Sequence, residues 1–500
     1  MRDFSARDFL ARYLPTGYLL GRDPLASVPA IVRWMIAVYA IVLNTYSIAR
    51  HLLFHSTAFD LSYFDQTAYL ISQGQTPIVS FWGYHFLGGH ADWILYPIAL
   101  LYKLVPSVYW LFTLQAIALS FAGLPLWWLT QSYGLSKQQG ITLVAVYLLQ
   151  PLVFNVNLFD FHPEVLAIPC LFAAVLAARG DRFLLFLGLT IFSLGCRDSL
   201  SLNIAALGLW LGLFERRWRY GLTAFILGTA WFGLATQVMI PTFRPGGVEA
   251  VARYGVLGDS LGEIIRSLFT RPDLVAQQLL TLPNLEYMAL LLAPLLWGLH
   301  WRSLPALLPG LPTLMLNLLT SYQPQKDLVH QYSLPILPWF LMAILIAMTQ
   351  KQTWLKSRRS ILIWSLITFL VLAKYSYLGT RYLSRIDTWQ ATRRAIALVQ
   401  PQSSLLTSNS IAPHLAHRTH LKLTVKLSPI TSLAPFDEVL LNSRHPGESA
   451  DPAAIAKYQA ELDADPAWQR IFAQDGVILW RRKSDDRKVS MAGFRTRLVF

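Results

Sequence analysis

Charged residues are scarce in this chain of 500 residues, and cysteine is almost absent. Asp, Glu, Lys and Arg together make up 14% of the sequence, against roughly 25% in a typical soluble domain. Hydrophobic residues make up 54%, and the mean hydropathy is +0.42. This composition excludes an ordinary soluble domain and predicts a polytopic membrane protein. The two cysteines, Cys170 and Cys196, lie in apolar segments, so we expect no disulfide that stabilises an exported domain.

The sequence also lacks internal repeats and low-complexity segments, and its C-terminal part has neither a Gly-rich phosphate loop nor a nucleophile elbow. The net charge of +14 does not indicate a nucleic-acid partner, because the basic residues stand in short clusters between apolar runs. Loops that face anionic membrane lipids explain this pattern better.

Apolar segments predict about 11 transmembrane helices in a mainly α-helical domain at 31–384. Basic clusters occupy alternate connections between these segments, which places the N-terminus in the cytoplasm and the chain after Lys374 outside. Residues 1–30 are a predicted cytoplasmic lead-in, and the protein is predicted to be a multi-pass protein of the inner or plasma membrane. The predicted spans are 31–49, 107–130, 139–154, 164–178, 183–196, 199–214, 220–240, 285–299, 303–319, 333–349 and 360–378.

After residue 384 the composition changes, and 385–500 is predicted to be a small extracytoplasmic α/β domain. An amphipathic helix is expected up to Pro401, and a second helix is expected to begin at Asn409 or Ser410. Strands are predicted at LKLTV, DEVLLN and GVILWRRK, and the pattern of 451–473 is helical.

One predicted outer loop, 50–106, is depleted of positive charge. From His51 to Tyr102 there is no Lys or Arg, where about four would be expected from the chain average. Such a gap marks the side of the membrane that positive charges avoid. The loop also gathers three carboxylates and four of the 11 histidines: Asp60, Asp65, Asp92, His51, His55, His85 and His90.

Several motifs resemble a bacterial family of membrane proteins, the domain-of-unknown-function family numbered 2079. They are FDLSYFDQ after the first span, HPE at the start of a later span, the RDS turn, and SNSIAPHLAHR in the terminal domain. The resemblance runs from about Phe59 to about Arg482. That family is similar to the GT-C membrane glycosyltransferases, which use polyprenyl-phosphate-linked sugars as donors.

The GT-C resemblance implies catalytic carboxylates in the first extracytoplasmic loop, and by position these are Asp60 and Asp65. The adjacent acidic pair that is usual in the superfamily is absent, because these aspartates are five residues apart. Which of them is catalytic, and whether a divalent metal ion is needed, therefore stay open.

The residues around Asp60 and Asp65 favour the same chemistry without the family. Transfer of a sugar from a lipid phosphate needs a base for the acceptor hydroxyl and donors that hold the leaving phosphate. Both aspartates lie among aromatic and aliphatic residues, where partial burial raises a carboxyl pKa towards the useful range. On a regular helix a spacing of five separates them by about 140°. The alternative is that they cap or salt-bridge the loop.

Asp160, His162 and Glu164 form a second polar cluster. Pro163 and Glu164 are typical of a helix start, which favours a structural role for the glutamate. Acid, histidine and acid in an extended loop can also ligate a metal ion, so the three residues are a candidate metal set.

Arg197 and Asp198 lie between two apolar runs, where ionisable groups are costly and often functional. Arg197 is the first candidate for a phosphate clamp, and the alternative is that it only pairs with Asp198. The remaining candidates for binding the lipid phosphate or the sugar are Lys326, His330, Tyr332 and His90.

The function that the sequence favours is transfer of a sugar from a polyprenyl-phosphate donor to an acceptor of unknown identity at the extracytoplasmic face. The alternatives are a transporter or lipid flippase, and a non-catalytic assembly protein. A transporter should place polar groups near the bilayer midplane in repeated, interrupted helices. Here polar residues gather at the predicted outer ends of spans, which favours chemistry at the membrane surface.

Overall fold

The computed structural model describes residues 27–426, 430–447 and 449–483. Most of the predicted lead-in, residues 1–26, and the C-terminal residues 484–500 lie outside the described residues. The chain divides into two compact units. The first unit comprises Met1–Ser47, Leu87–Ile94 and Leu111–Tyr375, and the second unit comprises Ile48–Phe86, Leu95–Trp110 and Ser376–Phe500.

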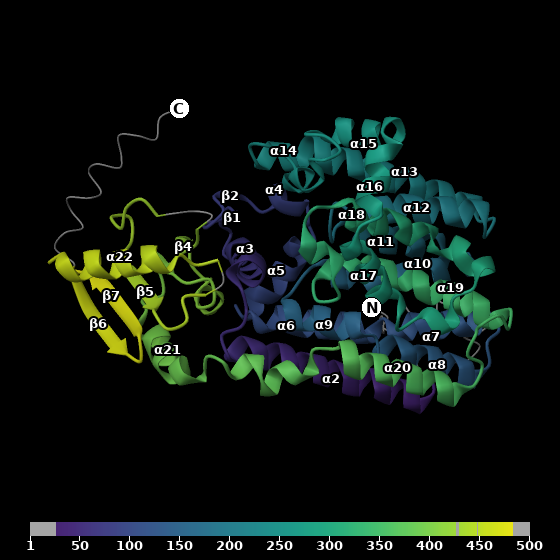
Figure 1. The fold of residues 1–500 in the computed structure, drawn as a ribbon, viewed down its shortest axis with the longest axis horizontal. Helices are drawn as coiled ribbons and strands as arrows, with labels where there is room; N and C mark the ends of the chain where they lie inside the picture. The colour runs from purple at the N-terminus through teal and green to yellow at the C-terminus, as the bar shows by residue number, and fades with distance from the viewer. Residues whose placement is uncertain (1–26, 427–429, 448, 484–500) are drawn as a thin grey trace, which may run out of the picture. The chain divides into compact units, whose positions relative to one another are not determined.

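The first unit is helical throughout its longer elements (Figure 1). Every predicted span coincides with a helical segment, because uninterrupted apolar runs of this length favour helices in which each backbone group is bonded internally. The helices, with those that continue into the second unit, are α2 (Ala30–Leu52), α4 (Leu87–His90), α6 (Tyr109–Phe121), α7 (Gly123–Ser132), α8 (Lys137–Leu148), α9 (Pro151–Phe159), α10 (Glu164–Arg179), α11 (Phe183–Leu194), α12 (Leu200–Leu213), α13 (Trp218–Leu234), α14 (Ile240–Phe243), α15 (Leu261–Thr270), α16 (Pro272–Leu279), α17 (Leu282–Leu292), α18 (Leu311–Leu319), α19 (Leu337–Thr349) and α20 (Arg358–Leu372).

Within the described residues, five helical segments are long and apolar enough to cross a membrane, and a bent pair that begins with α20 is a sixth candidate. Other apolar helices, such as α11 and α12 with 12 and 14 residues, are shorter than the roughly 20 residues that a perpendicular span needs. The five segments are Ala30–Leu52, Tyr109–Ser132, Lys137–Phe159, Trp218–Phe243 and Gln331–Thr349.

Glycine allows the backbones of α12 and α13 to touch. A Cβ atom added to Gly208 would lie 2.4 Å from the backbone nitrogen of Phe225, and one added to Gly221 would lie 2.6 Å from the Gly208 carbonyl oxygen. Gly228 meets the Ser201 carbonyl oxygen at 2.5 Å in the same way. Small residues at such spacing are the usual means by which membrane helices approach closely.

The second unit combines part of the predicted outer loop with the C-terminal α/β region. Its helices are α3 (Tyr63–Ser72), α5 (Leu95–Leu104), α21 (Ile386–Leu398) and α22 (Pro452–Ala464), and a short hairpin joins β1 (Ile78–Val79) to β2 (Tyr84–His85). A five-stranded sheet has the order β4-β3-β5-β7-β6 (Figure 1). Its strands are β3 (Leu405–Thr407), β4 (Leu421–Leu423), β5 (Glu438–Asn442), β6 (Trp468–Gln474) and β7 (Val477–Arg482).

The sheet is parallel on one side and antiparallel on the other. Strand β3 pairs in parallel with β4 and β5, and β5 and β6 each pair antiparallel with β7. Helix α22 packs Ile455, Tyr458 and Leu462 against a core that includes Trp468 and Trp480.

Three predicted strands are confirmed, but two predicted helices are wrong in part. The helical pattern of 451–473 ends at Ala464, and β6 follows it. The reason is Pro466, because the residue before a proline disfavours the α conformation. The helix expected from Asn409 or Ser410 is reduced to a 3-10 turn, Ala412–His414, since Pro413 cannot continue an α-helix there.

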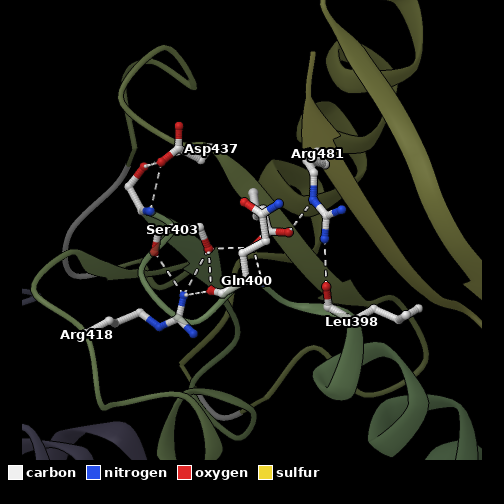
Figure 2. Close-up of polar contacts among 8 residues, drawn as sticks. Leu398, Gln400, Ser403, Arg418, Asp437 and Arg481 are labelled. Atoms are coloured by element: carbon white, nitrogen blue, oxygen red, sulfur yellow. Dashed lines mark hydrogen bonds and ion pairs between the residues drawn. The ribbon is translucent and has the colours of Figure 1, made fainter. Parts of the chain in front are cut away.

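A buried carboxylate holds α21 to the sheet. Glu438 on β5 is fully buried, and its oxygens accept hydrogen bonds from Arg481 Nε at 2.7 Å and from the backbone nitrogen of Gln400 at 2.9 Å. Arg481 also donates to the carbonyl oxygen of Leu398 at the end of α21, as Figure 2 shows. These charge-assisted bonds satisfy the carboxylate inside the unit.

Candidate functional site

The turn between α11 and α12 presents a buried polar cluster in the first unit. Arg197 Nη1 forms an ion pair with the carboxylate of Glu164, which lies in the first turn of α10. Arg197 Nη2 lies 3.2 Å from His90 Nε2, and His90 Nδ1 lies 3.4 Å from Asp198 Oδ1. Since a guanidinium only donates, Nε2 of His90 is assigned as the acceptor and Nδ1 as the protonated nitrogen that faces Asp198.

Two glycines allow backbone segments to press together around this cluster. A Cβ on Gly195 would lie 2.4 Å from the Trp93 ring, and a Cβ on Gly88 would lie 3.0 Å from the backbone of Phe243. The Ile94 amide donates to the Gly195 carbonyl oxygen at 3.1 Å. The segment 87–94 is therefore fixed against the α11–α12 turn, and His90 is held beside Arg197.

The charges in the cluster reinforce one another. Burial opposes a charged Arg197, but the carboxylate of Glu164 outweighs it and raises the pKa of the guanidinium. Burial would also raise the pKa of Asp198, but His90 and Arg197 together lower it. For His90, burial and the neighbouring Arg197 lower the pKa. The arrangement therefore favours a neutral His90 between a cation and an anion.

A cavity of about 380 Å³ in the first unit ends at this cluster. Its polar end is formed by His90, Glu164, Arg197 and Asp198, together with Arg253 and Tyr332. Its remaining wall is mostly apolar and comes largely from α15, α18 and the segment before α15. The apolar lining includes Leu202, Phe232, Val248, Val251, Leu261, Ile264, Ile265, Leu268, Met315, Leu316 and Leu319.

Arg253 is a second guanidinium at the polar end, and the sequence analysis did not select it. Its Nη1 donates to Gln325 Oε1 at 3.1 Å and to Tyr332 Oη at 3.4 Å. The guanidinium lies 4.4 Å from the Tyr322 ring centroid. Within the described part of the chain, no carboxylate lies within ion-pair distance of it. The available signal was its place in a predicted outer loop, where an arginine runs against the positive-inside bias.

The cavity suits an amphiphile with an anionic head. Arginine binds phosphate oxygens with several donors in a fixed plane, and the apolar walls can take a hydrocarbon chain. Of the predicted phosphate- and sugar-binding residues, the structure brings together Arg197, Asp198, His90 and Tyr332 in this wall. Lys326 and His330 are not part of it, and His330 Nδ1 instead lies 2.6 Å from Asp327 Oδ2.

The predicted metal set is not assembled. Glu164 is engaged by Arg197, while His162 Nδ1 lies 3.4 Å from the backbone oxygen of Asp160. Across residues 27–483, where the structure describes them, no group of three His, Cys, Asp or Glu side chains is placed to hold a metal ion. Glu164 acts as a counter-ion because the α11–α12 turn brings an arginine to it, which the linear spacing did not reveal.

Asp92 was counted with the polar residues of the predicted loop and is fully enclosed in the first unit. Both of its carboxyl oxygens are buried, with no hydrogen-bond partner among the described residues. Burial raises its pKa to about 8, so the carboxyl is largely protonated near neutral pH.

Asp65 belongs to the second unit and is buried in α3. Its Oδ1 accepts a hydrogen bond from Tyr102 Oη at 2.8 Å and lies 3.0 Å from His417 Nε2. The ring of His417 stacks on Tyr69 with centroids 4.5 Å apart. Burial would lower the pKa of His417, but the Asp65 carboxylate outweighs it and raises the pKa.

Asp60 lies in a π-helical turn, Ala58–Ser62, that leads directly into α3. It is half-buried, and its Oδ2 accepts a hydrogen bond from Thr57 Oγ1 at 3.0 Å. The wider π turn changes the angular relation between residues five apart that a regular helix would impose. Phe59 in the same turn packs near Trp82, with ring centroids 5.4 Å apart.

A second cavity of about 390 Å³ lies in the second unit beside Asp65. Its wall combines the Asp65 carboxylate with His417 and with His414, whose ring stacks on His51 at 3.9 Å. Nε2 of His414 is buried with no hydrogen-bond partner in the described residues. Arg418 fixes this wall by donating to the Ser403 backbone oxygen at 2.9 Å (Figure 2).

The sequence model of a family described as "Predicted membrane protein (DUF2079)" matches residues 50–479. The chain belongs to this family. The match includes every candidate site residue named above, from Asp60 to Arg418. No curated protein sequence matches this member of DUF2079.

Two solved structures share the fold of this DUF2079 chain. The crystal structure of ArnT from Cupriavidus metallidurans bound to undecaprenyl phosphate aligns with a TM-score of 0.53 and 10% identity, covering 90% of this chain and 98% of that chain. The apo state of ArnT aligns with a TM-score of 0.50 and 11% identity, covering 91% and 99%. At these identities the likeness concerns the fold.

Proposed function

We propose that this protein is a GT-C-type membrane glycosyltransferase that takes its sugar from a polyprenyl-phosphate donor. The carrying observation is the apolar cavity of the first unit that closes on Arg197 and Arg253. The shared fold adds support, because ArnT is a GT-C glycosyltransferase whose structure holds undecaprenyl phosphate.

The donor's isoprenoid chain lies along the apolar walls supplied by α15 and α18, and its phosphate lies at Arg253 and Arg197. The two guanidinium groups differ in availability. Arg197 is bound to Glu164, whereas Arg253 contacts the neutral groups of Gln325 and Tyr332. The N–H groups of Arg253 can therefore donate hydrogen bonds to a phosphate without leaving a buried carboxylate unpaired. Arg253 is the principal phosphate ligand in this proposal.

The predicted loop supplies the base, and Asp60 is the favoured residue, with Asp65 the second candidate. The acceptor hydroxyl oxygen bonds to the anomeric carbon as the bond from that carbon to the phosphate oxygen breaks. The hydroxyl proton passes to the carboxylate, and polyprenyl phosphate leaves as an anion. Asp65 already receives Tyr102 and His417 on one oxygen, so its carboxylate is better placed to organise the wall of the second cavity than to act as the base.

The proposal includes the topology predicted from the basic clusters. The chain crosses the membrane about 11 times, its N-terminus is cytoplasmic, and residues 385–500 form an extracytoplasmic domain. Some crossings then use helices as short as α11, which requires tilt or shielding by neighbouring helices. Both the donor phosphate and the acceptor hydroxyl are reached from the outer face.

Binding of undecaprenyl phosphate to the purified full chain, measured by native mass spectrometry, tests the donor site. Arg253→Gln should weaken binding by about 10- to 100-fold, the usual effect of losing one charge-assisted contact. Arg271→Gln is the matched control, because Arg271 is also an outer-loop arginine but is exposed and pairs with Asp273. Equal binding by both variants would reject the donor site.

A transfer assay with lipid-linked sugars extracted from the source membranes separates the enzyme from a lipid carrier. The enzyme should release polyprenyl phosphate in step with sugar transfer, and Arg253→Gln should reduce both. Binding of the lipid phosphate without sugar release by the wild-type protein would favour the flippase alternative.

A further inference from the structure

A third cavity lies at the ends of three helices of the first unit, on the side predicted to face the cytoplasm. It has a volume of about 350 Å³ and is formed where α8 begins, α19 ends and α20 begins. It is distinct from the two cavities described above and shares no residue with them. Its wall contains Gln138, Gln139, Thr142, Met348, Lys351, Thr353, Lys356, Arg358 and Ile361.

The ionisable groups in this wall are all cationic. Lys351, Lys356 and Arg358 converge on it, and its lining contains no carboxylate. Within the described ranges, none of the three forms an ion pair. Arg358 Nη1 donates to Gln138 Oε1 at 2.7 Å, which directs the guanidinium towards the start of α8. Three like charges around one cavity repel one another and favour an anion between them.

The N-termini of two helices add further positive potential at this cavity. Helices α8 and α20 both begin here, with Ser136 and Ser357 as their N-caps. The N-terminus of a helix carries a partial positive charge, which normally favours acidic residues in the first turn. The chain instead places Lys137 in the first turn of α8, and Arg358 and Arg359 in that of α20. These charges oppose the helix dipoles, and a bound anion would relieve the conflict.

Lys351 stands in a backbone conformation that normally selects glycine. It follows the C-cap of α19 with φ of 57°, a position at which glycine is the commonest residue. A lysine there is strained, because its Cβ atom crowds the following carbonyl oxygen. Residues with strained backbone conformations are concentrated at functional sites such as ligand-binding sites. Here the side chain adds its charge to the cavity.

Helix α20, whose first turn contributes Arg358 and Ile361 to the cavity, exposes apolar side chains further along. Ile363, Ile367 and Val371 on α20 are 48%, 55% and 72% exposed. Trp354 is 64% exposed and packs edge-on against Trp364, with ring centroids 5.8 Å apart. Exposed aliphatic side chains beyond a tryptophan pair are typical of a helix that enters the bilayer through the interface. An anion in the cavity with a hydrocarbon tail can lay that tail along α20.

We propose that this cavity binds the phosphate headgroup of an anionic membrane phospholipid of the cytoplasmic leaflet. The phosphate oxygens accept hydrogen bonds from Lys351, Lys356 and Arg358, and the acyl chains lie against α20. Basic pockets between membrane helices on the cytoplasmic side recognise lipids of this class. The site is independent of the proposed sugar transfer and does not rest on it.

Native mass spectrometry of the purified full chain, with phosphatidylglycerol, cardiolipin or phosphatidylcholine added, tests the proposal. The variant Lys351→Gln/Lys356→Gln/Arg358→Gln should lose anionic-lipid binding by on the order of 100-fold, at roughly fivefold per cation. The control Arg216→Gln/Arg219→Gln/Arg302→Gln removes the same charge from the same predicted side and should bind these lipids like the wild type. Thermal unfolding in detergent, at a melting temperature close to that of the wild type, checks that both variants are folded.

Three outcomes would overturn the proposal. One is equal loss in both triple variants, which would mean general surface attraction. Another is equal binding of phosphatidylcholine and phosphatidylglycerol. The third is displacement of the lipid by millimolar inorganic phosphate or pyrophosphate, which would assign the cavity to a free phosphate. If the triple variant does not fold, Lys351→Gly removes one charge and the backbone strain together, and it should bind lipid about fivefold less while being at least as stable.

Discussion

Arg197 and Glu164 form an ion pair between the α11–α12 turn and the first turn of α10. The two residues are 33 positions apart, and both side chains are almost fully buried. From the sequence, Asp198 was the alternative partner of Arg197, and Glu164 was assigned to a helix start or a metal set. The observed pairing means that the charge of Arg197 is compensated before any ligand enters the cavity.

Removing one member of this pair should therefore destabilise the first unit strongly. Glu164→Gln leaves a buried guanidinium without a counter-ion, and such changes cost about 3–5 kcal/mol. The fraction of protein that remains monodisperse after heating should fall well below that of the wild type. The double variant Glu164→Gln/Arg197→Met should regain part of that loss, and a double variant less stable than Glu164→Gln would contradict the pairing.

The assignment of the base is tested by Asp60→Asn and Asp65→Asn, which keep side-chain size and remove basicity. If Asp60 is the base, Asp60→Asn should insert normally and lose transfer by about 10²–10⁴-fold. Asp65→Asn should have the smaller effect on turnover. Normal turnover in both single variants and in the double variant, at normal expression, would reject catalysis from this loop.

His417 gives the second unit a pH dependence with a definite sign. Its pKa is raised by Asp65, so the stabilisation is complete below the unfolded value, about 6.5. It is lost as the pH rises through the higher folded pKa. The difference in melting temperature between wild type and His417→Gln should therefore be largest in acid and shrink in alkali. His420→Gln, at an exposed neighbour that is not paired with Asp65, is the matched control substitution.

The contact between α12 and α13 predicts unequal effects of two similar substitutions. Gly221→Ala places a methyl group within 3.0 Å of the α12 backbone, and it should destabilise the protein by about 1–3 kcal/mol. Gly233→Ala on the same helix meets nothing within 4 Å and should be neutral or mildly stabilising. Thermal unfolding of the two variants in detergent measures the difference, and equal melting temperatures would contradict close helix packing.

The predicted topology is checked by reporter fusions. A fusion after Lys374 should report the outer side and a fusion after Arg219 the cytoplasm, because alternate connections carry the basic clusters. A cytoplasmic location for the C-terminal domain would remove the base assigned to the loop from the outer face. It would also change the leaflet assigned to the cavity at Lys351.

The sequence was informative where a single segment decides the structure. The positions of the helices follow from apolar run length, and the strands β5 and β7 follow from short apolar runs that contain β-branched residues. Arg197, His90 and Tyr332 could be selected because polar residues in an apolar chain stand out. Their common location depends on the packing of helices that are distant in sequence, so linear spacing carried no information about it.

The features that the sequence did not predict also depend on contacts between segments that are distant in the chain. Strand β3 has three residues, too few for a periodic pattern, and it exists because β4 and β5 flank it. Arg253 was not selected from the sequence, because its cavity contacts come from Gln325 and Tyr332, more than 70 residues later. Charge that runs against a topological bias is therefore a signal to examine rather than to discount.

The glycine contacts between α12 and α13 bear on how the proposed lipid donor could enter the first cavity. Backbones that touch leave no room for one helix to slide or rotate against the other, so we expect α12 and α13 to move as one rigid pair. The start of α12 adjoins Arg197, and α13 supplies Phe232 to the wall. We therefore expect this side of the cavity to keep its shape. Passage of the proposed lipid donor then falls to the wall formed by α15, which supplies Ile265 to the cavity and on which Ile265 and Phe269 have 46% and 82% of their surface exposed.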